Sequence, residues 1–254
     1  MGASQRGGGI RKPERWLLAA AVLAVGFMIA GPAISQDPDY HHFADGRTFF
    51  GVPNFCNVIS NLAFLPIGIA GLLRNRSAWA RILFTGIALV TFGSGYYHWA
   101  PSDDTLFWDR LPMTLVFMGL TAHAIGLWAG ELWEPRLLLP LTLLGAASVV
   151  WWRVTGDLRP YAVAQFGPAL VLIPAAVSVA RVRGLGPAAW FYVLAKFAEA
   201  GDSWLYLHAP FSGHTLKHLL AALAAYWIYR WSSISYATAL PNPAQRPART
   251  GTGA

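Results

Sequence analysis

The sequence predicts an all-α integral membrane protein, with a core of seven transmembrane helices and one extra helix at the N-terminus. Hydrophobic residues make up 55% of the 254 residues and charged residues only 12%, about half of the ~25% that is usual in soluble domains. The chain also has twelve tryptophans, a residue type that concentrates at membrane–water interfaces. Apolar stretches recur along the chain and are long enough to cross a hydrocarbon core of ~30 Å.

Eight apolar segments carry this prediction. The first, 16–35, follows a basic head at 1–15 and precedes an outer loop at 36–54. The seven-helix domain is expected at 55–233, and a Gly- and Pro-rich tail at 234–254 is expected to be disordered. The segments of the domain are 55–73, 80–99, 109–129, 136–152, 162–181, 187–207 and 214–233.

The first apolar segment has two interpretations. A basic start, an apolar run and the small residues Ala33 to Ser35 are also the pattern of a cleaved signal peptide. The apolar run that begins at Trp16 is long for a signal peptide, so we expect a retained helix. Either interpretation leaves seven core helices with the same orientation.

The distribution of charge predicts the orientation. Most Lys and Arg residues fall on one side of the eight predicted spans, and most acidic residues fall in the opposite loops, so both termini are expected to be cytoplasmic. The net charge of +7 then reflects topology, and the absence of basic runs interleaved with aromatic residues argues against nucleic-acid binding. Cys56 is the only cysteine, which excludes an internal disulfide bond. The basic residues assigned to the cytoplasmic side are Arg6, Arg11, Lys12, Arg15, Arg74, Arg76, Arg81, Arg136, Arg181, Arg183, Arg230, Arg246 and Arg249.

Three histidines form the candidate metal site. His214 and His218 are four residues apart at the start of the last apolar segment, so they share one helix face and could hold one metal ion. Such a pair also arises by chance at a wet helix end. His98 lies at the outer end of the third segment, and the charge-based topology places it at the same membrane boundary. Three protein ligands with one open position are typical of catalytic zinc.

Asp109 and Ser94 are the candidate catalytic residues. Asp109 enters the fourth segment at the same boundary, where a carboxylate could orient or deprotonate a metal-bound water. The alternative is an acid that favours the dipole at a helix N-terminus. Ser94 lies one turn before His98 and could donate a hydrogen bond to a developing oxyanion. The alternative is a small residue that permits close helix packing.

Other polar residues in the apolar segments are expected to be structural. Lys196 and Glu199 are three residues apart and can pair. His123 is expected to be a satisfied core histidine, and His41 and His42 have no clear partner. Interhelical hydrogen bonds are the expected role of Asn57, Ser60 and Asn61.

Four features taken together resemble the alkaline ceramidase family of seven-span membrane amidases, which are related to adiponectin-receptor-like proteins. They are "NVISNLAFLP" at 57–66, "GSGYYHW" at 93–99, an aspartate eleven residues after His98, and "HTLKH" at 214–218. The resemblance runs from about residue 39 to residue 231. It implies that His98, His214 and His218 hold zinc. It also implies hydrolysis of the amide bond of a ceramide or ceramide-like N-acyl lipid. Zinc-activated water attacks the amide carbonyl, Asp109 takes the proton and Ser94 steadies the oxyanion.

The chain also departs from the family pattern. Asp39 and Asp45 remain from an acidic calcium site of eukaryotic members, but Asn54 stands where the family has an acidic residue, so calcium is left open. The short loops and the short Gly-rich head are typical of bacteria. We therefore expect a multi-pass protein of the bacterial inner membrane with its active site toward the periplasm. The substrate could be ceramide or another N-acylated amino lipid.

Two further functions remain open at this point. One is a heptahelical receptor or sensor with a structural zinc site; the presence of Ser94 and Asp109 beside the histidines favours the hydrolase instead. The other is a transporter that uses Lys196, Glu199 and Asp202 as a proton path. The expected partners are a lipid amide substrate and the bilayer, and the oligomeric state is left open.

Overall fold

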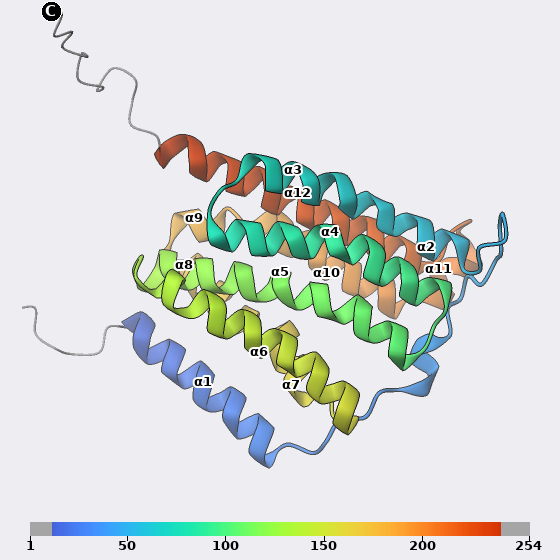
Figure 1. Ribbon diagram of the computed structural model, residues 1–254, viewed down its shortest axis with the longest axis horizontal. Helices are drawn as coiled ribbons and strands as arrows, with labels where there is room; N and C mark the ends of the chain where they lie inside the picture. The colour runs from blue at the N-terminus through green and yellow to red at the C-terminus, as the bar shows by residue number, and fades with distance from the viewer. Residues whose placement is uncertain (1–11, 240–254) are drawn as a thin grey trace, which may run out of the picture.

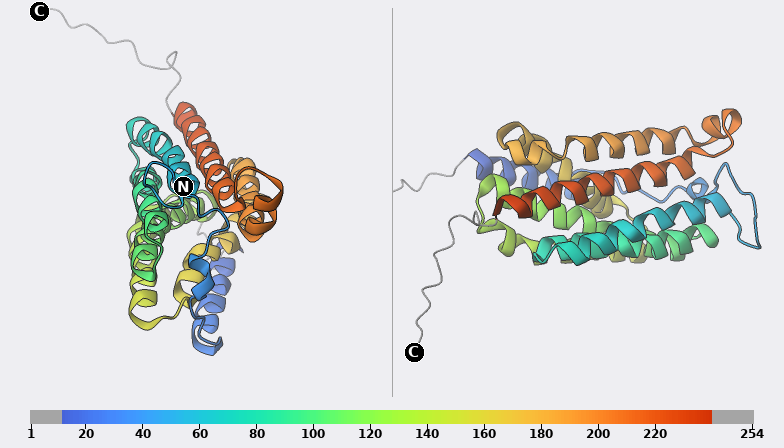
Figure 2. Two further views of the ribbon diagram at one scale, coloured as in Figure 1. Left: turned by 90° about the vertical axis from the view of Figure 1, so that its right-hand side faces the viewer. Right: turned by 90° about the horizontal axis from the view of Figure 1, so that it is seen from above.

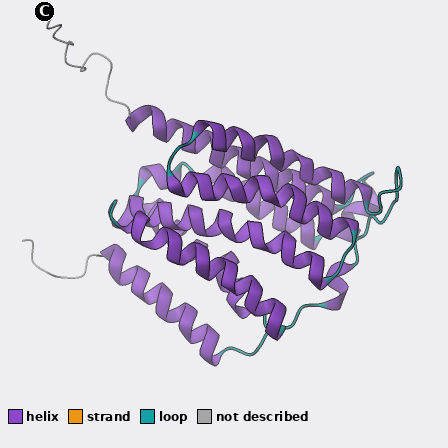
Figure 3. Ribbon diagram, viewed as in Figure 1, coloured by secondary structure: helices purple, strands orange, loops and turns teal. Residues whose placement is uncertain are grey.

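The computed structural model is a bundle of helices joined by loops (Figures 1 and 3), which confirms the all-α prediction. It describes the backbone of residues 12–239 and the side chains of residues 12–232. Arg6, Arg11, Arg246 and Arg249, which the sequence analysis assigned to the cytoplasmic side, lie outside the described residues. Large apolar side chains face outward around the bundle, among them Leu73, Ile29 and Val154, which are 81%, 80% and 79% exposed. Within residues 12–239, six helices or helix runs are long and apolar enough to cross a membrane.

These six candidate spans match the first six apolar segments. The second is continuous through α2 (Phe55–Ser60), η2 (Asn61–Ala63) and α3 (Phe64–Arg74). The sixth consists of α7 (Arg159–Phe166) and α8 (Pro168–Ser178), which are separated at Gly167. The other four are α1 (Lys12–Ala30), α4 (Ala78–Trp99), α5 (Asp103–Ala129) and α6 (Trp133–Thr155).

Several predicted boundaries were wrong, and three of them change which region a residue belongs to. Helix α1 begins at Lys12, inside the predicted head, and α5 begins at Asp103 instead of residue 109. The Ser102 side chain caps α5 in a capping box with Thr105, which satisfies N–H groups of the first turn. Helix α12 (Gly213–Ala239) continues past residue 233, so the first residues of the predicted disordered tail are helical.

The segment predicted at 187–207 is two helices, α10 (Gly186–Ala200) and α11 (Asp202–His208), which meet at Gly201. The Asp202 carboxylate accepts hydrogen bonds from the backbone N–H groups of His214 and Ala44, at 2.7 and 3.0 Å. It thereby holds α11, the start of α12 and the outer loop together. The remaining short elements are η1 (Pro38–His41) and α9 (Ala180–Arg183).

Two glycines permit the close helix contacts that form the site. A Cβ at Gly93 of α4 would collide with the Trp108 carbonyl of α5, and one at Gly213 would collide with the Ala198 carbonyl of α10. The first contact brings α4 against the turn of α5 that carries Asp109. The second brings the start of α12 against the end of α10, and Figure 2 shows these two helices side by side.

Helix α1 is attached to the core at both of its ends. Near its start, Trp16 Nε1 donates to the Leu170 carbonyl at 2.7 Å. Near its end, Arg159 Nη1 donates to the carbonyls of Met28 and Gly31, and Asp157 accepts from Arg159 Nε at 2.9 Å. These contacts support the interpretation of the first segment as an integral helix of the fold.

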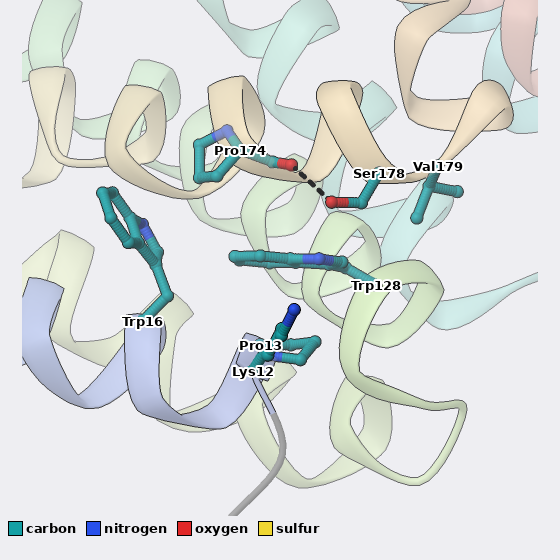
Figure 4. A pocket seen from close by; sticks show the side chains of 7 residues that line it. All are labelled: Lys12, Pro13, Trp16, Trp128, Pro174, Ser178 and Val179. Atoms are coloured by element: carbon teal, nitrogen blue, oxygen red, sulfur yellow. Dashed lines mark hydrogen bonds between the residues drawn. The ribbon is translucent and has the colours of Figure 1, made fainter.

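A pocket of about 450 Å³ lies between α1 and α8, at the end of α5 opposite Asp109. Figure 4 shows the rings of Trp16 and Trp128 facing into it, with Lys12 below and Pro174 above. This pocket is distant from the three histidines, because they lie at the other end of the bundle.

The attachment of α1 should weaken in acid. Asp157 lies in the loop between α6 and α7, and hydrogen bonds from Arg159 lower its pKa to about 2. Because the folded pKa is below the ~3.9 of an unfolded Asp, the stabilisation is present above about pH 4 and is lost as the pH falls toward 2. At neutral pH, Asp157→Asn should reproduce this loss as faster hydrogen exchange at residues 28–34, after correction for intrinsic rates. Asp104→Asn, which removes the partner of Arg153, is the control, and equal exchange in both variants would contradict the prediction.

Candidate metal centre

Three buried histidines meet at one end of the bundle, as the sequence predicted. His98 comes from the last turn of α4, and His214 and His218 come from the first turns of α12. One ring nitrogen from each lies within 4.8 Å of the others. Their exposed fractions are 1%, 5% and 4%. In the described part of the chain this is the one group of three or more His, Cys, Asp or Glu side chains close enough to hold a metal ion.

One pair of nitrogens in the cluster has the spacing of two ligands on a tetrahedral metal ion. The Nε2 atoms of His98 and His218 lie 3.1 Å apart. Two nitrogens bound to one zinc at ~2.0–2.1 Å are ~3.3 Å apart, so these side chains are close to the required separation. Three imidazoles form a donor set that suits zinc and also several other transition metals.

Hydrogen bonds orient His218 for this role. Its Nδ1 lies 2.8 Å from Ser60 Oγ, and the same hydroxyl lies 3.0 Å from the Asn57 carbonyl. Since the hydroxyl has one proton, which it donates to the carbonyl, Ser60 accepts from His218 Nδ1–H. The Nε2 of His218 is then unprotonated and faces His98. A second hydrogen bond of this kind fixes the orientation and tautomer of metal-binding histidines.

The polar residues of α2 and η2 therefore do more than the sequence analysis predicted. Asn57 Oδ1 accepts from Thr215 Oγ1 at 2.8 Å, which joins α2 to α12 as expected for an interhelical hydrogen bond. Asn61 Nδ2 donates to the Asn57 carbonyl at 2.8 Å. The orientation of His218 by Ser60 was missed, although the position of "NVISN" at the start of an apolar segment was a signal for it.

Asp109 and Ser94 lie on the two helices that Gly93 brings together. Ser94 is 3% exposed, and its hydroxyl is close enough to the half-buried Asp109 carboxyl to favour the ionised form of that group. The charges of Lys217 and Glu199, from α12 and α10, also act on Asp109. The structure thus places Asp109 in the electrostatic environment of the helix that carries two of the histidines.

Lys217 is a site residue that the sequence analysis missed. Its Nζ lies 2.8 Å from His214 Nε2 and 3.0 Å from Glu199 Oε1. Because an ammonium group only donates hydrogen bonds, His214 Nε2 accepts this one, and a metal ion would bind that nitrogen only in place of Lys217. The predicted pair of Lys196 and Glu199 is confirmed, at 2.8 Å. The sequence did contain a signal for Lys217, because it is an ionisable residue between the two histidines of an apolar helix.

The outer loop covers the cluster with aromatic side chains. The ring of Phe43 lies 4.7 Å from the rings of both His98 and His214. His41 contacts Tyr97 Oη at 3.1 Å through Nδ1 and Asp103 at 3.2 Å through Nε2. The expectation that His41 has no clear partner was therefore wrong.

The remaining histidines lie away from the cluster. His42 is exposed and lies 3.4 Å from Asp39, so it too has a partner. His123 is buried, stacks on Trp79 at 3.9 Å and contacts Glu134 at 2.5 Å. This agrees with the prediction of a core histidine.

The residues considered for calcium make contacts with other side chains and the backbone. Both carboxylate oxygens of Asp45 accept from Arg47, at 2.8 and 2.7 Å, and this hydrogen bonding lowers the pKa of Asp45. Asn54 Nδ2 donates to the His98 carbonyl at 2.9 Å, and Asp39 lies beside His42. The Arg47 guanidinium thus supplies the positive charge beside Asp45 that a cation would otherwise supply.

Compared with known proteins, the chain matches no protein-family model, no curated protein and no solved structure. The site itself combines three features: a buried set of three imidazoles, an adjacent carboxylate–hydroxyl pair, and a cation beside one imidazole. Such a combination can hold a metal ion and move a proton next to it.

Proposed function

We propose that this protein is a zinc-dependent intramembrane amide hydrolase that acts on ceramide or a ceramide-like N-acyl lipid. The observation that carries the proposal is the meeting of three buried histidines and the Asp109–Ser94 pair at one end of an apolar bundle. Zinc held by the histidines would polarise the amide carbonyl and lower the pKa of water to ~7. The sequence resemblance to alkaline ceramidases supports a lipid amide as the substrate.

The protein side chains have separate roles in this proposal. Ser60 holds His218 in the tautomer that presents Nε2, and Asp202 fixes the backbone of His214. Asp109 accepts the proton of the attacking water as the general base. Ser94 donates its hydroxyl proton to the carbonyl oxygen as that oxygen gains negative charge.

We further propose that the helices form a seven-helix core plus α1, with α10–α11 and α12 as the last two crossings. Both ends of the described chain lie at one end of the bundle, and the outer loop and the start of α12 lie at the other (Figure 1). Lys and Arg residues lie around the α3–α4 connection and in α9. They favour a cytoplasmic location for the end of the bundle where both ends of the described chain lie. The histidines would then face the periplasm of a bacterial inner membrane.

A heptahelical receptor or sensor with a structural zinc site is the second candidate. The observation that favours it is the burial of all three histidines under Phe43. A structural site has no need of the Asp109–Ser94 pair, and this pair is the reason to prefer the hydrolase.

Chelation tests the hydrolase directly. The purified protein in detergent should release fatty acid from N-palmitoyl lipids, lose this activity when a chelator strips the metal, and regain it with one equivalent of zinc but not with magnesium. Hydrolysis that survives complete removal of metal would contradict the metal mechanism. A zinc-loaded protein that hydrolyses no N-acyl lipid would favour the receptor.

A further inference from the structure

Arg110 follows the proposed base Asp109 in α5 and is buried in an aromatic slot. Arg110 as a whole residue is only 6% exposed. The guanidinium lies 4.2 Å from the ring centre of Trp152, 4.9 Å from that of Tyr161 and 5.7 Å from that of Tyr40. Flat stacking of this kind leaves the edge of the guanidinium as the part that forms hydrogen bonds.

The hydrogen bonds of Arg110 are incomplete. Nη2 donates to the Gln36 side-chain oxygen at 2.7 Å, whereas Nη1 is buried and has no hydrogen-bond partner. Two other arginines at this end, the exposed Arg47 and the half-buried Arg159, each bind an aspartate. Arg110 forms no salt bridge with a carboxylate of the described residues. Its acidic neighbour is Asp109, which it attracts without forming a salt bridge, so the buried Nη1 keeps a hydrogen-bonding capacity that is costly to leave unused.

The free and the exchangeable N–H groups match the two oxygens of a carboxylate. A guanidinium binds a carboxylate through two parallel N–H groups. Nη1 is available, and the contact of Nη2 is with a neutral, half-buried side chain from the loop before η1. A carboxylate that displaced Gln36 would form two hydrogen bonds between opposite charges in place of one to a neutral amide.

Arg110 is also close to the proposed reaction site. It acts electrostatically on the adjacent Asp109. The Tyr40 ring that it faces stacks on Tyr97 at 6.5 Å, and Tyr97 in turn lies 4.8 Å from the His98 ring. Two aromatic rings in succession, Tyr40 and Tyr97, therefore link the guanidinium to the histidine cluster.

We propose that Arg110 binds the carboxylate of an acylated ligand. Since ceramide carries no anionic group, the proposal makes an N-acyl amino acid the preferred substrate class; the released fatty acid is the other source of such a carboxylate. This substrate class rests on the proposed amide hydrolysis, but the binding of a carboxylate by Arg110 does not.

Ligand-induced thermal stabilisation tests the proposal without turnover. Two matched pairs share a palmitoyl chain and differ in charge: N-palmitoylglycine against N-palmitoylethanolamine, and palmitate against palmitamide. The zinc-loaded protein should bind the acid of at least one pair more tightly than its neutral partner, by about 10- to 100-fold for a charge-assisted pair. The amide ligands are measured with Asp109→Asn as the background, so that they persist during the measurement.

Arg110→Gln should abolish this preference, and Arg110→Lys, which keeps the charge but not the fork, should retain only part of it. Arg153→Gln removes a cation of α6 at the same end of the bundle and should leave the preference intact. A preference confined to the glycine pair identifies the substrate as the source of the carboxylate, and one confined to the palmitate pair identifies the product.

Two results would overturn the proposal. One is equal binding of the acid and neutral ligands by protein that retains Arg110, measured in the Asp109→Asn background for the amides. The other is an unchanged preference in Arg110→Gln, which would assign the carboxylate to zinc. A charge preference without hydrolysis of any N-acyl lipid would contradict the proposed hydrolase function and support the Arg110 site. Hydrolysis without a charge preference would support the hydrolase function and contradict the Arg110 site.

Discussion

Replacing His218 with alanine should remove bound zinc from a protein that otherwise retains about one zinc per chain. The His218 imidazole lies 3.1 Å from His98 and is oriented by Ser60, so its loss takes away one of three ligands and leaves the other two unable to close the site. Partners outside the ligand set alone are worth 10- to 100-fold in metal affinity. We therefore expect the loss of a ligand to weaken affinity by on the order of 100-fold or more. Elemental analysis after dialysis against a zinc buffer measures this directly.

Two further variants calibrate the result. Ser60→Ala removes the acceptor of the His218 Nδ1 proton but keeps all three imidazoles, so its affinity should fall between parent and His218→Ala. His42→Ala, in the exposed part of the outer loop, should retain full zinc. A folded parent without zinc, or His218→Ala with a full complement, would show that the cluster is not a zinc site.

Replacing Asp109 with asparagine should reduce turnover by about 10²- to 10⁴-fold, the usual contribution of a general base. Asparagine has nearly the same shape but cannot accept the proton of the attacking water. Zinc content should be unchanged, because Asp109 lies on α5 and the three ligands lie on α4 and α12. Fatty-acid release at matched zinc content is the measurement.

Asp104→Asn is the matched control for this change. Asp104 lies on the first turn of the same helix, is exposed and pairs with Arg153, so its variant should keep the parent rate. If Asp109→Asn also kept the parent rate with zinc bound, Asp109 would be no more than a structural partner of Ser94. The receptor with a structural metal site would then become the better description.

Much of the site follows from local sequence pattern. The spacing of His214 and His218 places both on one face of α12, since residues four apart on a helix are neighbours. The excess of apolar residues predicts a membrane protein and locates six of its spans, because each span must satisfy its backbone hydrogen bonds within itself. Charge distribution predicts that His98 belongs at the same boundary.

Other features could not be read from local pattern. The cap by Ser102 moved the start of α5, and the break at Gly201 divides an apolar stretch that would pass for one span. Lys217 and Arg110 each appear in sequence as one basic residue among apolar ones. The structure shows what surrounds each charge. Lys217 contacts Glu199 and His214, and Arg110 lies against three aromatic rings.

The sequence by itself determined the helical membrane class, the shared face of His214 and His218, and the identity of the candidate ligands. The tertiary structure alone decided that His98 reaches them, that Ser60 fixes a tautomer, and that Arg110 Nη1 is buried without a hydrogen-bond partner. The division has a physical reason. Helix periodicity and hydropathy depend on neighbours along the chain, whereas contacts between helices depend on how closely their backbones approach. That approach is set here by single glycines such as Gly93 and Gly213.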